Sequence, residues 1–261
     1  LMRADSVVEG LYSALDTGNS LMLIVSPAAP AAGLEEGNRI TPLIAAGAGF
    51  GKGLLISDST RRPGVVSNAD LLPTVLDYFG LRLPSGVMGS PMEYRKADGA
   101  LGYLKEMDKQ FMETRAARWP LVVAFCVLDF ALLCAAALLL LRASGRIKRP
   151  REPRRLARFT GFASVVLLSV PLSFLAVSAF RYRGVLFPAV FCASFAFSLG
   201  LASWLLQRGN RRLDPVVSVC LLTSAVILAD LLTGGRLLLF PLLGDTPLEG
   251  ARFFGLTNVM V

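Results

Sequence analysis

The sequence contains no histidine. Histidine is the commonest zinc ligand and the commonest general base near neutral pH, so chemistry of either kind would have to use other side chains. Cysteine is scarce, and all four residues lie inside apolar runs, at Cys126, Cys134, Cys192 and Cys220. This placement excludes a disulfide framework and a CxxC-type metal site, and it predicts that the four side chains act as small apolar groups.

Acidic residues are the minority among the charges. The chain has 27 Lys and Arg against 19 Asp and Glu, a net charge of +8. On a folded surface this excess would suggest a nucleic-acid partner. Here most of it lies in loops between apolar segments, where it is a topology signal, and we expect no nucleic-acid binding. A hydrophobic content of 54% and a mean hydropathy of +0.57 indicate a polytopic membrane protein, with a boundary near Arg118 and Trp119.

Long apolar windows dominate the second half of the chain. A span of about 30 Å of hydrocarbon needs about 20 helical residues, and four windows are long enough: 119–141, 159–180, 185–206 and 215–233. The connection over 142–158 carries eight Lys or Arg and that over 207–214 carries three, whereas 181–184 and 236–261 carry two each. The positive-inside rule therefore places the first two connections in the cytoplasm of a bacterial-type plasma membrane. The N-terminal region and residues 234–261 are expected outside, and whether a further span follows stays open.

Two carboxylates interrupt the predicted spans. Asp129 lies near the middle of the first, and Asp230 lies near the outer end of the fourth. A charge at the bilayer centre costs about 3 kcal/mol on insertion scales, so such residues face a bundle interior, where they mark a pathway or hold helices together. We favour the second interpretation, with each carboxylate protonated or paired, and Arg236 or Arg183 as the partner of Asp230.

The first half of the chain alternates helix and strand signals, which predicts an α/β domain with a parallel or mixed sheet covered by helices. Ser67 and Asp70 form a candidate capping box. The glycine-rich stretch over 47–53 lacks the GK[ST] ending of a phosphate loop, and we interpret it as a turn. The expected elements are a helix over 4–17 capped by Gly18, strands at 21–27, 39–47 and 54–57, a helix over 67–80 and a charged helical stalk over 93–118.

Three motifs follow one another here: SLMLIVSP (20–27), GLEEGNRITPLIAAGAG (33–49) and SNADLLPTVLDYFGLRLPSGVMGSPM (67–92). Their order and spacing resemble the C-terminal part of the alkaline-phosphatase-like superfamily, which includes sulfatases, phosphodiesterases and cofactor-independent phosphoglycerate mutases. The most specific match is NADLLPTVLDYFG. The resemblance covers about residues 1–92 and implies the last part of an extracytoplasmic α/β domain, joined to an all-α transmembrane bundle of about four helices.

The chain departs from that superfamily at the metal site. Where relatives have a metal-binding Asp-His pair, this sequence has Ser26 and Pro27. The further His or Lys expected before the next strand is absent, and Glu35 and Glu36 alone do not rebuild a two-metal site. No catalytic residue, metal ligand or cofactor is therefore expected here. Two divalent ions, zinc, manganese or calcium, are implied only if an upstream part supplies the nucleophile and ligands. Asp70 is interpreted as a helix cap.

Arg61 and Arg62 are the candidate contacts to an anion or a lipid head group, with a solvated turn as the interpretation that we favour. Three functions are considered for the whole chain. The first, which we favour, is a pseudoenzyme that binds or regulates an envelope lipid or glycan. The second is an active phosphate- or sulfate-ester hydrolase completed upstream of Leu1, because the chain reads as an internal fragment. The third is a transporter or lipid-linked transferase in the bundle, motivated by Asp129, the span prolines Pro171 and Pro188, which are predicted to kink their helices, and the segment 244–258.

Overall fold

The computed structural model describes residues 2–144, 154–209, 214–235, 237, 240, 242 and 243. They fall into two compact units, one that ends at Lys109 and one that begins at Gln110. We call these the N-terminal unit and the bundle. The division lies inside one continuous helix, before the boundary predicted near Arg118.

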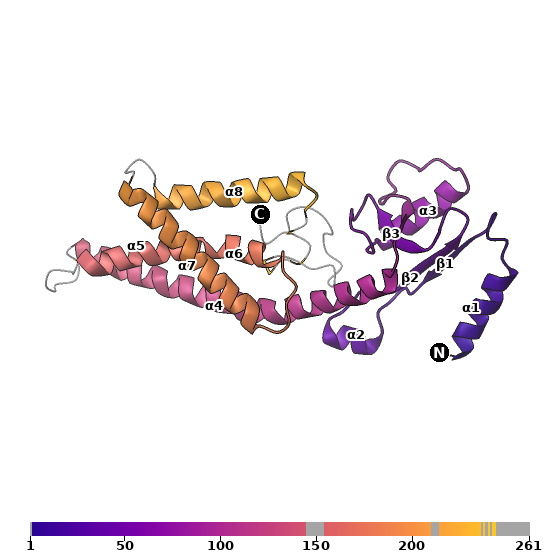
Figure 1. The fold of residues 1–261 in the computed structure, drawn as a ribbon, viewed down its shortest axis with the longest axis horizontal. Helices are drawn as coiled ribbons and strands as arrows, with labels where there is room; N and C mark the ends of the chain where they lie inside the picture. The colour runs from indigo at the N-terminus through magenta and orange to yellow at the C-terminus, as the bar shows by residue number, and fades with distance from the viewer. Residues whose placement is uncertain are drawn as a thin grey trace. The chain divides into compact units, whose positions relative to one another are not determined.

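The N-terminal unit contains short helices and two small sheets (Figure 1). Strands β1 and β2 pair antiparallel, with Leu21 opposite Gly47. Strands β3 and β4 also pair antiparallel, with Ser57 opposite Met92. In chain order the elements are α1 (Met2–Ala14), β1 (Leu21–Val25), α2 (Ala31–Glu36), β2 (Leu43–Gly47), β3 (Gly53–Ser57), the 3-10 turn η1 (Asn68–Asp70), α3 (Leu71–Tyr78) and β4 (Met92–Lys96).

The predicted parallel or mixed sheet is wrong for the described residues, which form two separate antiparallel pairs. A parallel β1–β2 pair would need a crossover that brings the chain back to the same end of the sheet. The connection contains only the six-residue helix α2, which ends at the left-handed Gly37. The chain therefore returns beside β1 in the opposite direction. Strand β1 is half-buried throughout, not fully buried as its apolar composition suggested.

Two local predictions have different outcomes. The glycine-rich stretch is a turn, as predicted: Gly47 and Gly49 have φ values of 103° and 81°, and the Phe50 amide donates to the Gly47 carbonyl at 2.9 Å. Gly18 is not the cap of α1, because that helix ends earlier, at Ala14. The Gly18 amide donates instead to the side chain of Asp16 at 3.1 Å, which closes a separate turn.

The charged stalk begins later than predicted. Residues 92–96 form β4, whose backbone groups are used by pairing with β3. The helix that follows, α4 (Ala100–Ala143), is 44 residues long and runs without a break from charged sequence into the first predicted span. Met107 and Phe111 are buried in the first part of this helix, whereas Leu101 is exposed.

The bundle consists of the rest of α4 together with α5 (Arg154–Leu168), α6 (Val170–Val177), α7 (Leu186–Gly209) and α8 (Pro215–Leu232). Within the described ranges, four helical stretches are long and apolar enough to cross a membrane: Ala100–Arg142, Arg155–Val177, Leu186–Gln207 and Pro215–Leu232. The four predicted spans are thereby confirmed as helices at these places, and the chain is a helical membrane protein.

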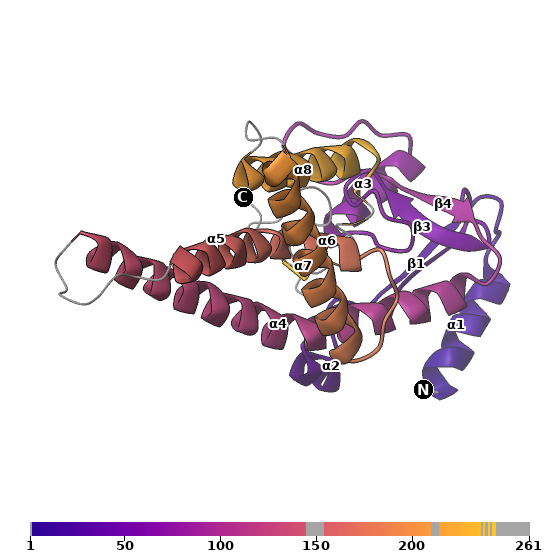
Figure 2. The ribbon, with the colours of Figure 1, turned by 60° about the vertical axis from the view of Figure 1, so that its left-hand side comes forward.

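Helix α7 packs against α5, α6 and α8 (Figure 2). The second span is broken between α5 and α6 at Ser169, two residues before Pro171, whose missing amide interrupts the helical ladder. The interruption lies where a kink was predicted, although the backbone of Ser169 itself stays in the right-handed helical region. Pro188 does not kink α7, because it lies in the first turn, where a backbone amide has no helical acceptor to lose.

Candidate functional site

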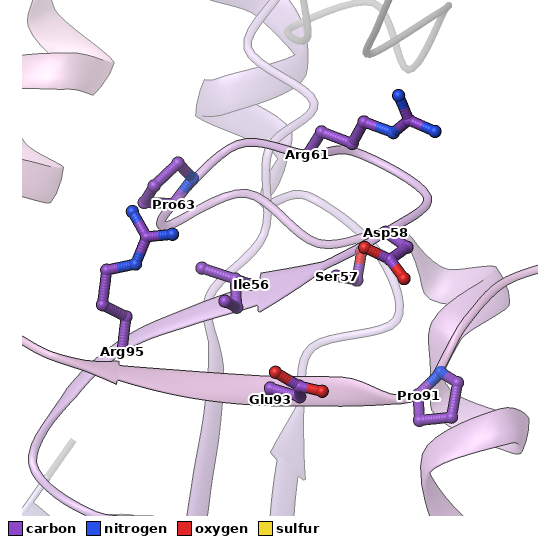
Figure 3. A pocket seen from close by; sticks show the side chains of 8 residues that line it. All are labelled: Ile56, Ser57, Asp58, Arg61, Pro63, Pro91, Glu93 and Arg95. Carbon is purple, nitrogen blue, oxygen red and sulfur yellow. The ribbon is translucent and has the colours of Figure 1, made fainter. Parts of the chain in front are cut away.

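A pocket of about 230 Å³ opens in the N-terminal unit between the β3–β4 pair and the loop over 58–66. Figure 3 shows its floor on the two strands and its upper wall on the loop. We call it the arginine pocket, because two arginines line it, one from each side. Its lining residues are Ile56, Ser57, Asp58, Arg61, Pro63, Pro91, Glu93 and Arg95.

The strand register explains the floor. Ile56 lies opposite Glu93, and Leu54 lies opposite Arg95. Because side chains alternate along a strand, these four lie on the same face of the pair. Glu93 and Arg95 are exposed, whereas Leu54 is buried. The floor of the pocket therefore carries the charged side chains of Glu93 and Arg95 beside the apolar side chain of Ile56.

The loop over 58–66 is fastened to β3 at two points. The Arg61 amide donates to the Ser57 carbonyl and the Gly64 amide donates to the Leu55 carbonyl, each at 2.8 Å. Arg61 has a φ of 52°, in the left-handed region that residues other than glycine seldom adopt. The side chain of Arg61 is exposed and lies at the rim of the pocket.

A buried carboxylate, Asp70, also fixes the start of this loop, through the hydroxyl group of Ser59. Its side chain is 0% exposed and accepts four hydrogen bonds. The Oγ of Ser57 and the Oγ of Ser59 donate at 2.7 and 2.5 Å. The amides of Ser67 and Ser90 donate at 2.8 and 3.0 Å. We call these five residues the Asp70 network, and they join the end of β3, the start of α3 and the approach to β4.

The electrostatics of Asp70 follow from these contacts. Burial alone raises the pKa of the carboxyl group, but hydrogen bonds from the Ser59 and Ser57 side chains and from the Ser67 and Ser90 amides outweigh it. The net pKa lies below the usual 3.8. Asp70 is therefore an ionised structural group whose acceptors are occupied, and the predicted capping box with Ser67 is confirmed.

The two predicted arginine contacts are separated in space. Arg61 lies at the pocket rim, whereas Arg62 is buried at 8% exposure and does not line the pocket. A solvated turn is therefore wrong for Arg62. Adjacent positions of a tight turn point in different directions, so the sequence alone did not distinguish the two.

The remaining predicted positions do not join the pocket. Ser26 donates its Oγ to the carbonyl of Ala28 at 3.1 Å, and Pro27 is exposed. Glu35 and Glu36 lie on α2, outside the pocket lining. Across the ranges that the structure describes, His, Cys, Asp and Glu form no group of three that suits a metal ion.

The two carboxylates of the spans occupy different environments. Asp129 is half-exposed on α4, and no residue in the most apolar stretch of that helix is buried by other described residues. Asp230 is buried at 5% exposure, and its Oδ1 accepts the Leu237 amide at 2.9 Å. Its Oδ2 has no hydrogen-bond partner among the described residues, which include Arg183. The predicted partner Arg236 lies outside them.

Sequence reasoning missed Asp58, Glu93 and Arg95 as pocket residues. The signal for the last two was the stretch MEYRK, where Glu93 and Arg95 alternate with Tyr94 as in a strand. Reading these residues as the start of a charged helix hid that alternation.

Comparison of the chain with family models, curated proteins and solved structures finds no match.

Proposed function

We propose that this chain is a membrane-anchored envelope protein whose extracytoplasmic N-terminal unit binds a component of the cell envelope. The resemblance to the C-terminal part of the alkaline-phosphatase-like superfamily supports a scaffold from that group with a degenerate metal site. The observation that carries the binding role is the arginine pocket, because it gathers charged side chains from two separate segments around one opening.

The side chains of the pocket suggest the class of ligand. A guanidinium group presents several N–H donors in a fixed plane and binds phosphate or sulfate groups in pairs of hydrogen bonds. Arg61 and Arg95 supply two such groups. Asp58 and Glu93 are acceptors and suit the hydroxyl groups of a sugar. A phosphorylated or sulfated glycan, or a head group of the same chemistry, meets both requirements.

The Asp70 network supports binding rather than hydrolysis. Asp70 belongs to the motif with the most specific resemblance to the hydrolase superfamily, yet its oxygens accept four hydrogen bonds from protein groups. A carboxylate occupied in this way is a poor metal ligand, because metal binding would have to displace those donors. Its role in this proposal is to hold the wall of the pocket.

The alternatives differ in what they require. An active ester hydrolase would need a nucleophile and two divalent metals held by residues beyond those described, and cleavage of a model phosphate or sulfate ester by the purified chain would favour it. A transporter or lipid-linked transferase would use the bundle. An envelope phenotype that depends on Asp129, tested by Asp129→Asn, would favour that alternative.

The proposal is tested by adding glucose 6-phosphate, glucose 6-sulfate or glucose to the full chain in lipid nanodiscs and measuring binding by saturation-transfer NMR. We expect the two charged sugars to bind and glucose to bind more weakly. Arg95→Gln should weaken binding of the charged sugars by about 10- to 100-fold, since a hydrogen bond to a charged group contributes about 1.5–3 kcal/mol.

Arg82→Gln is the matched control. Arg82 is exposed in the same unit but does not line the pocket, so its removal changes the net charge equally. Equal losses in the two variants would mean that the signal reflects overall charge, and the pocket would then not be the binding site. The same conclusion would follow if Arg95→Gln bound as tightly as the unmodified chain.

A further inference from the structure

The loop over 178–185 joins α6 to α7 and is anchored to α4. Its central residue, Tyr182, is buried at 6% exposure and donates its hydroxyl to the Oγ1 of Thr114 at 3.3 Å. The Gly184 amide donates to the Oε2 of Glu113 at 2.7 Å. At the other end, the Ser178 Oγ donates to the carbonyl of Phe240 at 2.8 Å. The loop therefore has a fixed conformation on the bundle.

This anchoring determines where the two arginines of the loop lie. Arg181 and Arg183 flank the inward-pointing Tyr182, and both are exposed. They lie at the end of the bundle where α4 enters, since the anchors Glu113 and Thr114 belong to the early part of that helix. The charge bias of the connections places few basic residues at this end. Two arginines among four residues therefore need an explanation other than topology.

An aromatic column begins directly beside these arginines. The rings of Tyr182, Phe187, Phe191 and Phe195 stack in succession, with centroid separations of 6.2, 6.1 and 5.7 Å. The three phenylalanines recur every four residues and so share one face of α7. Phe180 joins the top of the column, 5.1 Å from Phe191 and 6.3 Å from Phe187. Phe180 and Phe187 remain 47% and 45% exposed.

We propose that this surface, formed by Arg181 and Arg183 above Phe180 and Phe187, binds an anionic phospholipid of the leaflet on that side. The guanidinium groups contact the phosphate, and the exposed ring faces contact the upper part of an acyl chain. The exposed Leu186 and Val190 extend the apolar surface down α7. Charge complementarity identifies the occupant: a cationic pair at the membrane surface, continuous with apolar rings, matches an anionic head group with its chain.

The anchoring of the loop makes the site specific rather than a diffuse positive surface. Tyr182 and Gly184 are tied to α4, so the loop backbone that carries the two arginines does not have to be ordered when the lipid binds. The rings of the column pack on one another, and Tyr182 and Phe191 also pack in the bundle core with Phe174, Val177 and Cys192. A lipid therefore meets a preformed surface.

The test is native mass spectrometry of the full chain released from mixed micelles that contain equal amounts of phosphatidylglycerol and phosphatidylcholine. We expect phosphatidylglycerol to remain bound in preference. Each basic residue near an anionic head group contributes about fivefold in affinity, so Arg181→Gln with Arg183→Gln should lower retention by about 25-fold. Phe187→Leu, which removes the ring and keeps an apolar side chain, should weaken retention without abolishing the preference.

The control removes two exposed charges elsewhere, by Lys52→Gln with Arg82→Gln in the N-terminal unit. It should retain phosphatidylglycerol as the unmodified chain does, and an equal loss would overturn the proposal. Thermal unfolding of every variant separates lost binding from lost folding. Displacement of the lipid by an excess of glycerol 3-phosphate would also overturn it, because the site would then recognise a free phosphate group and not a membrane lipid.

Discussion

A single carboxylate, Asp70, connects three segments that are distant in sequence. Ser57 ends β3 and Ser59 follows it, Ser67 precedes α3, and Ser90 leads into β4. The Ser90 amide reaches Asp70 because Gly89, with a φ of 101°, lies so close to the Ala69 carbonyl that a Cβ would be 2.3 Å from its oxygen. The shape of the arginine pocket therefore depends on a buried charge that does not line it.

The low pKa of Asp70 predicts acid sensitivity of the N-terminal unit. Burial raises this pKa, but the four hydrogen bonds together lower it by more than burial raises it. The folded-state pKa is therefore below the usual 3.8. Folding therefore stabilises the ionised form, and its contribution is present above pH 3.8 and is lost as the pH falls through the folded-state value. Hydrogen exchange at the Ser67 and Ser90 amides, followed as the pH falls, should show this loss after correction for the intrinsic exchange rate.

Asp70→Asn should remove most of that pH dependence and destabilise the unit by about 2 kcal/mol or more, because hydrogen bonds to a charged acceptor are lost. Asp77→Asn is the control, since Asp77 is an exposed carboxylate on the next helix. If Asp70→Asn protected the two amides as well as the unmodified chain does, the network would not have the structural role assigned to it.

The sequence predicted one part of this network and not the rest, for a physical reason. The pair Ser67 and Asp70 is local, and its spacing alone indicates a capping box. The donors Ser57, Ser59 and Ser90 are brought to Asp70 by the β3–β4 pairing, which no local pattern specifies. The pocket has the same dependence, because Arg61 and Arg95 come from segments that only that pairing brings together.

At the scale of elements, the long apolar helices and the places of β1, β2 and β3 were predicted, whereas β4 and the pairing of the strands were not. A span of about 20 apolar residues is specified by its own composition, because lipid forces the backbone to satisfy its hydrogen bonds within the segment. A five-residue strand such as β4 is specified by its partner: Tyr94 lies opposite Leu55 and Glu93 opposite Ile56. The charged composition of β4 resembles that of the helix after it, so its sequence favoured the wrong element.

Close packing of α7 on α5 gives a prediction for two glycines. A Cβ at Gly200 would lie 2.9 Å from the Cα of Val166, so the helices would have to move apart. A Cβ at Gly161 would meet only the Trp204 ring, at 3.6 Å, an ordinary contact. Both substitutions to alanine gain the same intrinsic helix propensity, which isolates the packing effect. Gly200→Ala should destabilise the bundle by about 1–3 kcal/mol, the usual range for overpacking.

The measurement is unfolding in detergent as denaturant is increased, followed by circular dichroism. Gly161→Ala should unfold at or above the midpoint of the unmodified chain, and Gly200→Ala should unfold earlier. A Gly200→Ala chain as stable as Gly161→Ala would contradict the close approach of α5 and α7. Ala196 lies one turn before Gly200 and is 1% exposed, which fits the rule that small residues permit close contact between membrane helices.

The whole molecule combines a charged N-terminal unit with a bundle whose helices expose apolar side chains. Leu128, Leu133 and Leu140 on α4, for example, are 57%, 59% and 71% exposed. In water such a surface would aggregate, whereas in a bilayer it contacts lipid. Both proposed sites depend on this arrangement, because the arginine pocket needs access to the envelope and the lipid surface needs a leaflet beside it.

The sidedness of the four spans is the prediction on which the proposed envelope role depends. Because an even number of crossings returns the chain to its starting side, residues before α4 and after α8 should lie together, opposite the connection between α4 and α5. Ser85 is exposed in the N-terminal unit and Ser144 is exposed at the end of α4, so each accepts a cysteine without disturbing packing. In intact cells a membrane-impermeant maleimide should label Ser85→Cys, and it should label Ser144→Cys only after the membrane is opened. The unmodified chain is the blank, since its four cysteines lie within spans. The reverse pattern would place the arginine pocket in the cytoplasm, and the proposed envelope ligand would then have no access to it.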